Sequence, residues 1–316
     1  MSQILTLQFD VLSPNRDRVG ESPVWHDAEQ ALYWVDIEGR AIRRYDWAAR
    51  STRSWQTDER VACIALRAGG GLVAGMESGL FAVDLPEAGE RADTRLLQAV
   101  THPRDGMRFN DGRCDRQGRL WASTMVMDMG LAAADGVLRR FDSIGLSEPL
   151  VGGLLTGNGL GFSPDGRVMY LSDSHPKVQR IWRFDLGEDG VPQGRREFVD
   201  MNPYPGRPDG AAVDAEGCYW ICGNDAGQVH RFTPEGRLDR SLQLPVSKPA
   251  MCSFGGPGME WLFVTSIPPA QPAPGFDASL DGAVLVLRPG VKGIAEVPFG
   301  GRKPSLHTAS APVGAA

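Results

Sequence analysis

The sequence predicts an all-β protein and, more specifically, a six-bladed β-propeller. Of its 316 residues 39 are Gly and 23 are Pro, so about a fifth of the chain favours turns, which excludes a helix bundle and favours many short strands. An Asp- and Gly-rich turn followed by an apolar or aromatic pair recurs with a mean spacing of about 46 residues. A repeat of this length with about four strands is the size of one propeller blade. Six repeats fit the length, so residues 1–300 are expected to form a single domain.

The repeat is justified blade by blade from a landmark pair in each expected second strand. The pairs are Tyr33-Trp34, Leu72-Val73, Leu120-Trp121, Met169-Tyr170, Tyr219-Trp220 and Trp261-Leu262, with spacings of 39, 48, 49, 50 and 42 residues. A third strand is expected after five of them, over residues 41–46, 79–84, 137–142, 179–185 and 228–233. The fourth strand is expected to be less regular. The chain lacks the Trp-Asp and Gly-His signatures of a WD40 array, and a β-sandwich pair would have no fixed period.

Composition excludes several classes of function. The chain has 33 basic and 39 acidic residues, a net charge of −6 and only four Lys, so no basic stripe is present for nucleic acid. The first residues lack the features of a signal peptide and no window of about 18 apolar residues occurs, so a soluble, cytoplasmic protein without a membrane partner is expected. Five Cys without a CxxC pair predict buried free thiols rather than disulfides or a zinc site. Residues 301–316 are expected to form a poorly ordered tail.

The first strand of each blade is expected to begin about eleven residues before the landmark pair, with its start at the central channel. Two blades carry Ala62 and Met251 there, as burial would select. The other four carry oxygen-bearing side chains, namely Glu21, Asn110, Asn158 and Asp209, and the last three each precede the Gly of the next turn by eight residues. Two carboxylates and two amides are hard ligands that match a divalent cation such as Ca²⁺, Mg²⁺ or Mn²⁺.

A simpler interpretation is that Asn and Asp cap turns at the starts of strands. Capping explains one or two of these residues easily. It does not explain Glu21, which is a poor turn residue, or four polar side chains in one register. The pattern therefore favours a metal site in the central channel.

At these positions the sequence resembles the SMP-30/gluconolactonase/LRE family. The segments that carry the resemblance are GESPVW at 20–25, YWVDI at 33–37, RFNDG at 108–112, GNGLGFSPDG at 157–166 and RPDGAAVD at 207–214, within a likeness that covers residues 21–286. The resemblance implies a six-bladed propeller with one divalent metal held by Glu21, Asn158 and Asp209, with Asn110 near the metal or its water. It also implies that Arg108 binds the sugar. Asp128 falls where some members have a substrate-contacting Glu, and its shorter side chain departs from that pattern.

Members of this family typically hydrolyse sugar lactones to aldonic acids, so a metal-dependent lactonase of carbohydrate catabolism is expected. A bound dication can polarise the lactone carbonyl and activate water, while a carboxylate takes the proton. Asp209 is the candidate general base and a metal ligand, Asn110 orients water or substrate, and Arg108 can donate a planar pair of hydrogen bonds to sugar hydroxyls. The ion stays open among Ca²⁺, Mg²⁺, Mn²⁺, Zn²⁺ and Fe²⁺, as do the lactone and the oligomeric state. Two alternatives remain, a promiscuous esterase or organophosphatase on the same site and a metal-stabilised propeller that binds without turnover.

Overall fold

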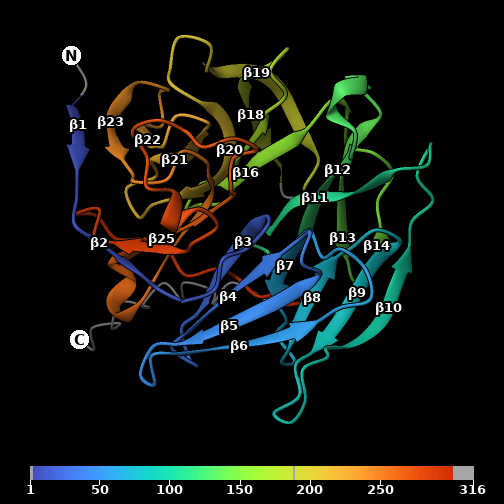
Figure 1. The fold of residues 1–316 in the computed structure, drawn as a ribbon. Helices are drawn as coiled ribbons and strands as arrows, with labels where there is room; N and C mark the ends of the chain where they lie inside the picture. The colour runs from blue at the N-terminus through green and yellow to red at the C-terminus, as the bar shows by residue number, and fades with distance from the viewer. Residues whose placement is uncertain (1–2, 188, 302–316) are drawn as a thin grey trace, which may run out of the picture.

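Six β-sheets arranged around one axis make up the computed structural model, which describes residues 3–187 and 189–301 (Figure 1). Each of the first four sheets follows the order of the chain. Their strands are β3 (Gly20–His26), β4 (Ala31–Asp36), β5 (Ala41–Asp46) and β6 (Ser51–Gln56) in blade 1; β7 (Cys63–Leu66), β8 (Leu72–Gly75), β9 (Gly79–Asp84) and β10 (Asp93–Ala99) in blade 2; β11 (Met107–Cys114), β12 (Leu120–Val126), β13 (Gly136–Asp142), β14 (Gly145–Leu146) and β15 (Val151–Leu154) in blade 3; and β16 (Gly157–Phe162), β17 (Val168–Asp173), β18 (Arg180–Leu186) and β19 (Pro192–Asp200) in blade 4.

The last two blades each include a strand from the N-terminal end of the chain. Blade 5 contains β20 (Arg207–Val213), β21 (Tyr219–Asn224), β22 (Gln228–Phe232) and β23 (Leu238–Gln243), to which β1 (Gln3–Thr6) adds in parallel. Blade 6 contains β24 (Pro249–Gly255), β25 (Trp261–Ser266) and β26 (Leu285–Leu287), and β2 (Phe9–Val11) pairs antiparallel with β26. The N-terminal segment therefore completes the blade that the C-terminal part of the chain begins.

The first strands of the six blades form a closed ring around the axis. Each contacts the first strand of the next blade, from β3 through β7, β11, β16 and β20 to β24, and β24 contacts β3 again. In Figure 1 most of these strands lie towards the middle of the view, whereas β10, β19 and β23 lie towards its edge. The predicted six-bladed all-β propeller is confirmed.

The strand predictions agree closely with the structure. The expected third strands at 41–46 and 79–84 coincide with β5 and β9, and the other three differ from β13, β18 and β22 by one residue at one or both ends. The fourth strand is irregular in blade 3, where β14 and β15 both pair with β13.

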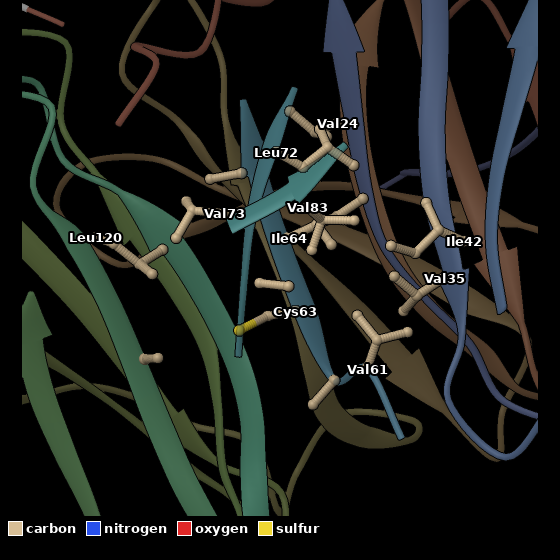
Figure 2. Packing of buried hydrophobic residues seen from close by; sticks show 14 of the residues in the cluster. Val24, Val35, Ile42, Val61, Cys63, Ile64, Leu72, Val73, Val83 and Leu120 are labelled. Carbon is tan, nitrogen blue, oxygen red and sulfur yellow. The ribbon is translucent and has the colours of Figure 1, made fainter. Parts of the chain in front are cut away.

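Apolar side chains fill the wedges between neighbouring blades. Figure 2 shows Val35 and Ile42 of blade 1 close to Val61 and Ile64 of blade 2, with Leu120 of blade 3 on the other side. All five Cys are buried free thiols, as predicted, and burial raises the pKa of Cys63 to about 12. The hydrophobic core therefore lies between the sheets, and the first strands surround the central channel.

Helical structure in the described ranges is confined to three short 3₁₀ segments, η1 (Met129–Leu131), η2 (Pro257–Met259) and η3 (Ala278–Leu280). No helix in the described part of the chain has the length and apolar content to cross a membrane. Of the predicted tail, residues 302–316 lie outside the described residues.

Candidate active site in the central channel

The four polar residues predicted at the channel all lie where a first strand leaves regular pairing. The register of the strand pair shifts between Glu21 and Val24, between Phe109 and Gly112, between Asn158 and Gly161, and between Pro208 and Ala211. A β-bulge re-aims side chains, and bulges are frequent beside active sites. Blade 6 has the same shift, between Pro249 and Cys252 around the apolar Met251, whereas in blade 2 β7 pairs with β8 without a shift.

Glycine at two of the bulges allows close packing against side chains of neighbouring strands. Gly159 has a φ of 59°, and a Cβ there would lie 2.5 Å from Ser172 Oγ. A Cβ on Gly210 would lie 2.3 Å from the Cβ of Met251. The Gly residues beside Asn158 and Asp209 are therefore required by close packing at the axis.

Asn158 and Asp209 are in direct contact across the boundary between blades 4 and 5. Asn158 Nδ2 donates to Asp209 Oδ1 over 2.7 Å and to Ser174 Oγ over 3.2 Å. Both site residues are buried, with 4% and 6% of their surface exposed. With its amide nitrogen committed to these two oxygens, Asn158 has its carbonyl oxygen left for another ligand.

Glu21 faces the same group of residues from blade 1. Burial raises its pKa well above the usual value, and the negative charges of Asp209 and Asp111 raise it further, against the hydrogen bond from the Ser22 backbone N–H. Burial also raises the pKa of Asp209 to about 6, although the positive charge of Arg207 and a hydrogen bond from Asn224 act in the opposite direction. The channel thus brings together carboxylates that disfavour each other's ionisation.

Arg108 and Asn110 form a second pair of predicted residues. Arg108 Nη1 donates to Asn110 Oδ1 and to Phe109 O, each over 2.8 Å, and Asn110 Nδ2 donates to Gly157 O over 2.9 Å. Burial lowers the pKa of Arg108, while the carboxylates of Glu38 and Glu21 raise it. Arg108 Nε is buried without a hydrogen-bond partner among the described residues, so the guanidinium has at least one N–H group that is not hydrogen-bonded.

Asp128 makes no hydrogen bond or ion pair with these residues in the described part of the chain. It is exposed at the N-terminal cap of η1, where its carboxylate accepts from the Gly130 backbone N–H over 3.0 Å. This local hydrogen bond is the only one that the Asp128 side chain makes in the described ranges. A substrate contact by Asp128 stays a prediction.

Two further polar residues at the site were missed by the sequence analysis. Asp111 accepts from the Leu160 backbone N–H over 2.7 Å through Oδ2, while its buried Oδ1 has no hydrogen-bond partner in the described ranges. Asn224 Nδ2 donates to Asp209 Oδ2 over 2.6 Å. Two polar residues in succession, Asn110 and Asp111, in a fully buried strand are a signal that could have indicated the bulge.

The far end of the channel is covered by residues 292–300. Their backbone bonds to turns of blades 5 and 6 at Ala215 and Met259, and to blades 2 and 3 at Leu66 and Gly118. Glu296 from this segment forms an ion pair with Arg113 of β11. Residues 292–300 therefore lie across the ends of the first strands opposite to Glu21, Asn158 and Asp209.

The residues present fit a divalent cation on chemical grounds. In the described ranges no three His, Cys, Asp or Glu side chains gather as a metal site, so the amide oxygen of Asn158 is needed beside Glu21 and Asp209. Two interacting acids whose pKa values are raised, together with the amide oxygen of Asn158, form a hard, negatively charged donor set. Such a set favours Ca²⁺, Mg²⁺ or Mn²⁺ over softer metals.

The chain is similar to known proteins over most of its length. A family model described as the SMP-30/Gluconolactonase/LRE-like region matches residues 19–268. The chain is 38% identical over 287 residues to a 6-deoxy-6-sulfogluconolactonase of Pseudomonas putida, covering 90% of this chain and 95% of that protein. It is 31% identical over 249 residues to pentonolactonase XacC of Haloferax volcanii, covering 79% and 81%.

Among solved structures, a calcium-binding protein, regucalcin from Agrobacterium tumefaciens, has the same fold. The TM-score is 0.85 with 24% identity, and the match covers 95% of this chain and 99% of that one. The six-bladed arrangement is thus shared over nearly the full length of both chains.

Proposed function

Because the chain belongs to the SMP-30/gluconolactonase/LRE-like family, we propose that it is a metal-dependent lactonase that hydrolyses a sugar lactone to the aldonic acid. The observation that carries this proposal is the contact of Asn158 with Asp209 beside Glu21, at the starts of three first strands. The names of the two lactonase relatives support sugar lactones as the substrate class. The calcium-binding neighbour supports a divalent cation.

Glu21, Asn158 and Asp209 are the residues that would hold the ion. A divalent cation bound there polarises a carbonyl and lowers the pKa of bound water. Asp209 is the proposed proton acceptor, because its carboxylate is buried and contacts Asn158 in the group that would hold the ion. Asn158 and Asn224 each donate to one of its oxygens and hold the carboxylate in a single orientation.

Arg108 and Asn110 are proposed to position the substrate. Arg108 Nη1 is engaged by Phe109 O and Asn110 Oδ1, which fixes the plane of the guanidinium. The remaining N–H groups can donate to sugar hydroxyls, a role that a planar Arg performs better than a Lys. Asp128 on η1 remains a proposed contact for the more distant part of the sugar.

The experiment is a pH-indicator assay with glucono-, pentono- and 6-deoxy-6-sulfogluconolactone on protein stripped by a chelator and refilled with single metals. We expect no turnover without metal and turnover of at least one lactone after refilling. Asp209→Asn should lower kcat by at least about a hundredfold because it removes the candidate base. Asn158→Asp should lower kcat less, because it keeps an oxygen ligand and the base, although it loses the hydrogen bond to Asp209 Oδ1. The metal content of each variant is measured alongside.

Asp185→Asn is the matched control, because it makes the same acid-to-amide change at an exposed position on β18. It should leave turnover within about twofold of the wild type. Full activity of the stripped protein would refute metal dependence. Hydrolysis of simple esters or phosphotriesters without any lactone would favour the esterase alternative, and metal binding without turnover would favour the binding propeller.

A further inference from the structure

Three of the four blades that carry a candidate site residue end their second strand with an Asp or an Asn. These residues pair with the beginning of the first strand, Asp36 with Gly20, Asp173 with Gly157, and Asn224 with Arg207. Each therefore lies one or two positions from a residue of the candidate site along the partner strand. All three are buried, with 3%, 1% and 1% of their surface exposed.

In blades 1 and 4 this residue is an Asp whose carboxylate accepts hydrogen bonds from backbone N–H groups. Asp36 accepts hydrogen bonds from the backbone N–H groups of Arg18, Val19 and Gly39. Asp173 accepts from those of Leu155, Thr156 and His175. Both carboxylates thereby fasten the segment that leads into the first strand.

Blade 5 replaces the acid with an amide that points at a carboxylate. Asn224 Nδ2 donates to Asp209 Oδ2 over 2.6 Å. An Asp at this position would set two acceptors against each other, so a donor is required by the chemistry of its partner. The substitution of amide for acid occurs in the blade that carries the candidate general base.

The orientation of this amide is fixed from the other side. Arg207 Nη2 donates to Asn224 Oδ1 over 3.3 Å, so the amide nitrogen is the atom left to face Asp209. Arg207 is held in turn by Asp225 Oδ2 over 2.6 Å and by Ser174 O over 3.2 Å. A chain of polar contacts thus runs from Asp225 through Arg207 and Asn224 to Asp209.

We propose that Asn224 is a positioning residue that fixes the rotation of the Asp209 carboxylate, with Arg207 fixing the amide of Asn224. Asp209 accepts from Asn158 on Oδ1 and from Asn224 on Oδ2, so each oxygen keeps a lone pair in a defined direction. Asn224 acts through Asp209 rather than on the substrate. This inference rests on the proposed metal-dependent function, in which Asp209 is a ligand.

The test measures binding of Mn²⁺ alone to the stripped full-length protein by calorimetry, together with kcat and KM on the best lactone. Asn224→Leu keeps most of the side-chain volume but removes the donor. Because hydrogen bonds to charged groups are the stronger ones, we expect Mn²⁺ affinity and kcat each to fall roughly ten- to a hundredfold, with KM within about threefold. Arg207→Ala should give a smaller loss and add little to Asn224→Leu in the double variant, because both act through one amide.

Ser241→Ala controls for simple destabilisation of blade 5. It removes the hydrogen bond between Ser241 and His230 on the outer strands of the same sheet and does not touch Asp209. It should lower Tm while leaving Mn²⁺ affinity and kcat within about twofold. Mn²⁺ affinity and kcat unchanged in Asn224→Leu, or lost equally in Ser241→Ala, would overturn the inference while leaving the lactonase intact. A wild-type protein that binds no Mn²⁺ and hydrolyses no lactone would overturn both.

Discussion

At the scale of single residues, the buried acids of the channel lower the free energy of unfolding of the metal-free protein at neutral pH. Asp209 is buried, and its pKa is raised from an ordinary 3.8 to about 6. A shift of this size corresponds to about 3 kcal/mol of stability lost at neutral pH, and Glu21 is shifted in the same direction. A cation bound by these carboxylates, as proposed, would offset that cost, so bound metal and pH should act on stability together.

The stabilisation given by Mn²⁺ should grow as the pH rises from about 4 to above 6. In this window the folded metal-free protein retains protons on Asp209 that the unfolded chain has lost, so raising the pH lowers its free energy of unfolding. The metal-bound protein keeps these groups ionised and lacks this loss. The measurement is the difference in Tm with and without saturating Mn²⁺ from pH 4.5 to 8, which cancels the titration of distant groups.

Asp209→Asn is the control for this prediction, because it removes the titrating group. Its difference in Tm should be smaller and should depend less on pH over the same range. A difference in Tm that is equally large at pH 4.5 and pH 8 in the wild-type protein would contradict the prediction.

Four of the residues that line the channel could be predicted because they break the pattern of their own repeat. The corresponding position in the other two blades is apolar and buried, as Ala62 and Met251. Four blades instead carry a polar residue there, namely Glu21, Asn110, Asn158 and Asp209. Asp111 and Asn224 could not be predicted in the same way. The alternation of a regular strand would turn Asp111 away from Asn110, and Asn224 lies at a strand end, where Asn is common for local reasons.

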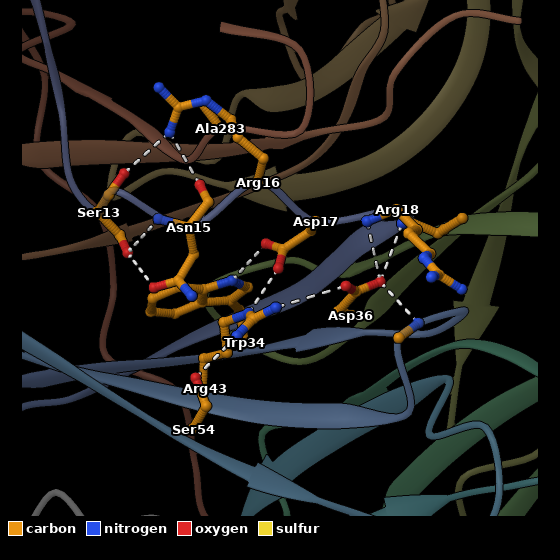
Figure 3. A network of polar contacts seen from close by, with 12 residues as sticks. Ser13, Asn15, Arg16, Asp17, Arg18, Trp34, Asp36, Arg43, Ser54 and Ala283 are labelled. Carbon is orange, nitrogen blue, oxygen red and sulfur yellow. Dashed lines mark hydrogen bonds and ion pairs between the residues drawn. The ribbon is translucent and has the colours of Figure 1, made fainter.

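At the scale of the element, blades 1, 3 and 5 share a buried cluster of Asp, Trp and Arg. The indole Nε1 donates to Asp17 from Trp34, to Asp115 from Trp121 and to Asp214 from Trp220, over 2.8, 2.9 and 2.8 Å. An Arg also bonds each Asp, and Figure 3 shows Arg43 beside Trp34 and Asp17 in blade 1. The landmark Trp therefore joins two strands or turns by a polar contact as well as by packing.

The sequence predicted the strand that carries each Trp but not its acidic partner. The Asp lies six residues before the Trp in blades 3 and 5, but 17 residues before it in blade 1, where it comes from the segment preceding β3. An Asp at the same spacing before every Trp would have allowed the Asp–Trp pair to be predicted from the sequence. Because the Asp comes from different parts of the chain in different blades, a search for a repeat of fixed period does not find the pair.

Asp214→Ala should lower the free energy of unfolding by about 3–5 kcal/mol, because it leaves buried donors without a partner. Asp214 is fully buried and accepts from Trp220 Nε1, from Arg231 Nε and from the backbone N–H groups of Glu216 and Cys218. Since Asp214 lies at the end of the first strand far from Asp209, kcat of the folded protein should stay within about threefold. Urea denaturation and kcat at low temperature measure the two effects.

Asp239→Asn provides the comparison on the same Arg231. Asp239 is about one-third exposed, and its ion pair with Arg231 should contribute less than about 1 kcal/mol. Equal losses in the two variants would mean that the buried cluster does not hold blade 5 together.

At the scale of the whole molecule, the ring is closed by a contact between the two ends of the sequence. β2 pairs with β26 from Phe9 opposite Leu287 to Val11 opposite Leu285, and the Leu12 backbone N–H donates to Val284 O. The six repeats could be predicted from their period, but this closure could not. The segment before residue 20 has no landmark pair, and a strand of three exposed residues is too short to give a pattern.

Deleting residues 1–12 should destabilise the whole propeller rather than one blade. Without β2, blade 6 keeps only three strands, its outermost strand β26 is three residues long, and β24 still has to hold the ring to β3. Short, unpaired outer strands are marginal by themselves, so the loss should spread through β24 to both neighbouring blades.

Deleting residues 1–7 is the matched control, because β1 only adds a parallel strand to a blade that already has four. We expect a small decrease in Tm for the shorter deletion and, for the longer one, a large decrease with early exposure of the buried thiols to a thiol reagent. Similar melting curves for the two truncated proteins would place the closure of the ring elsewhere than at β2.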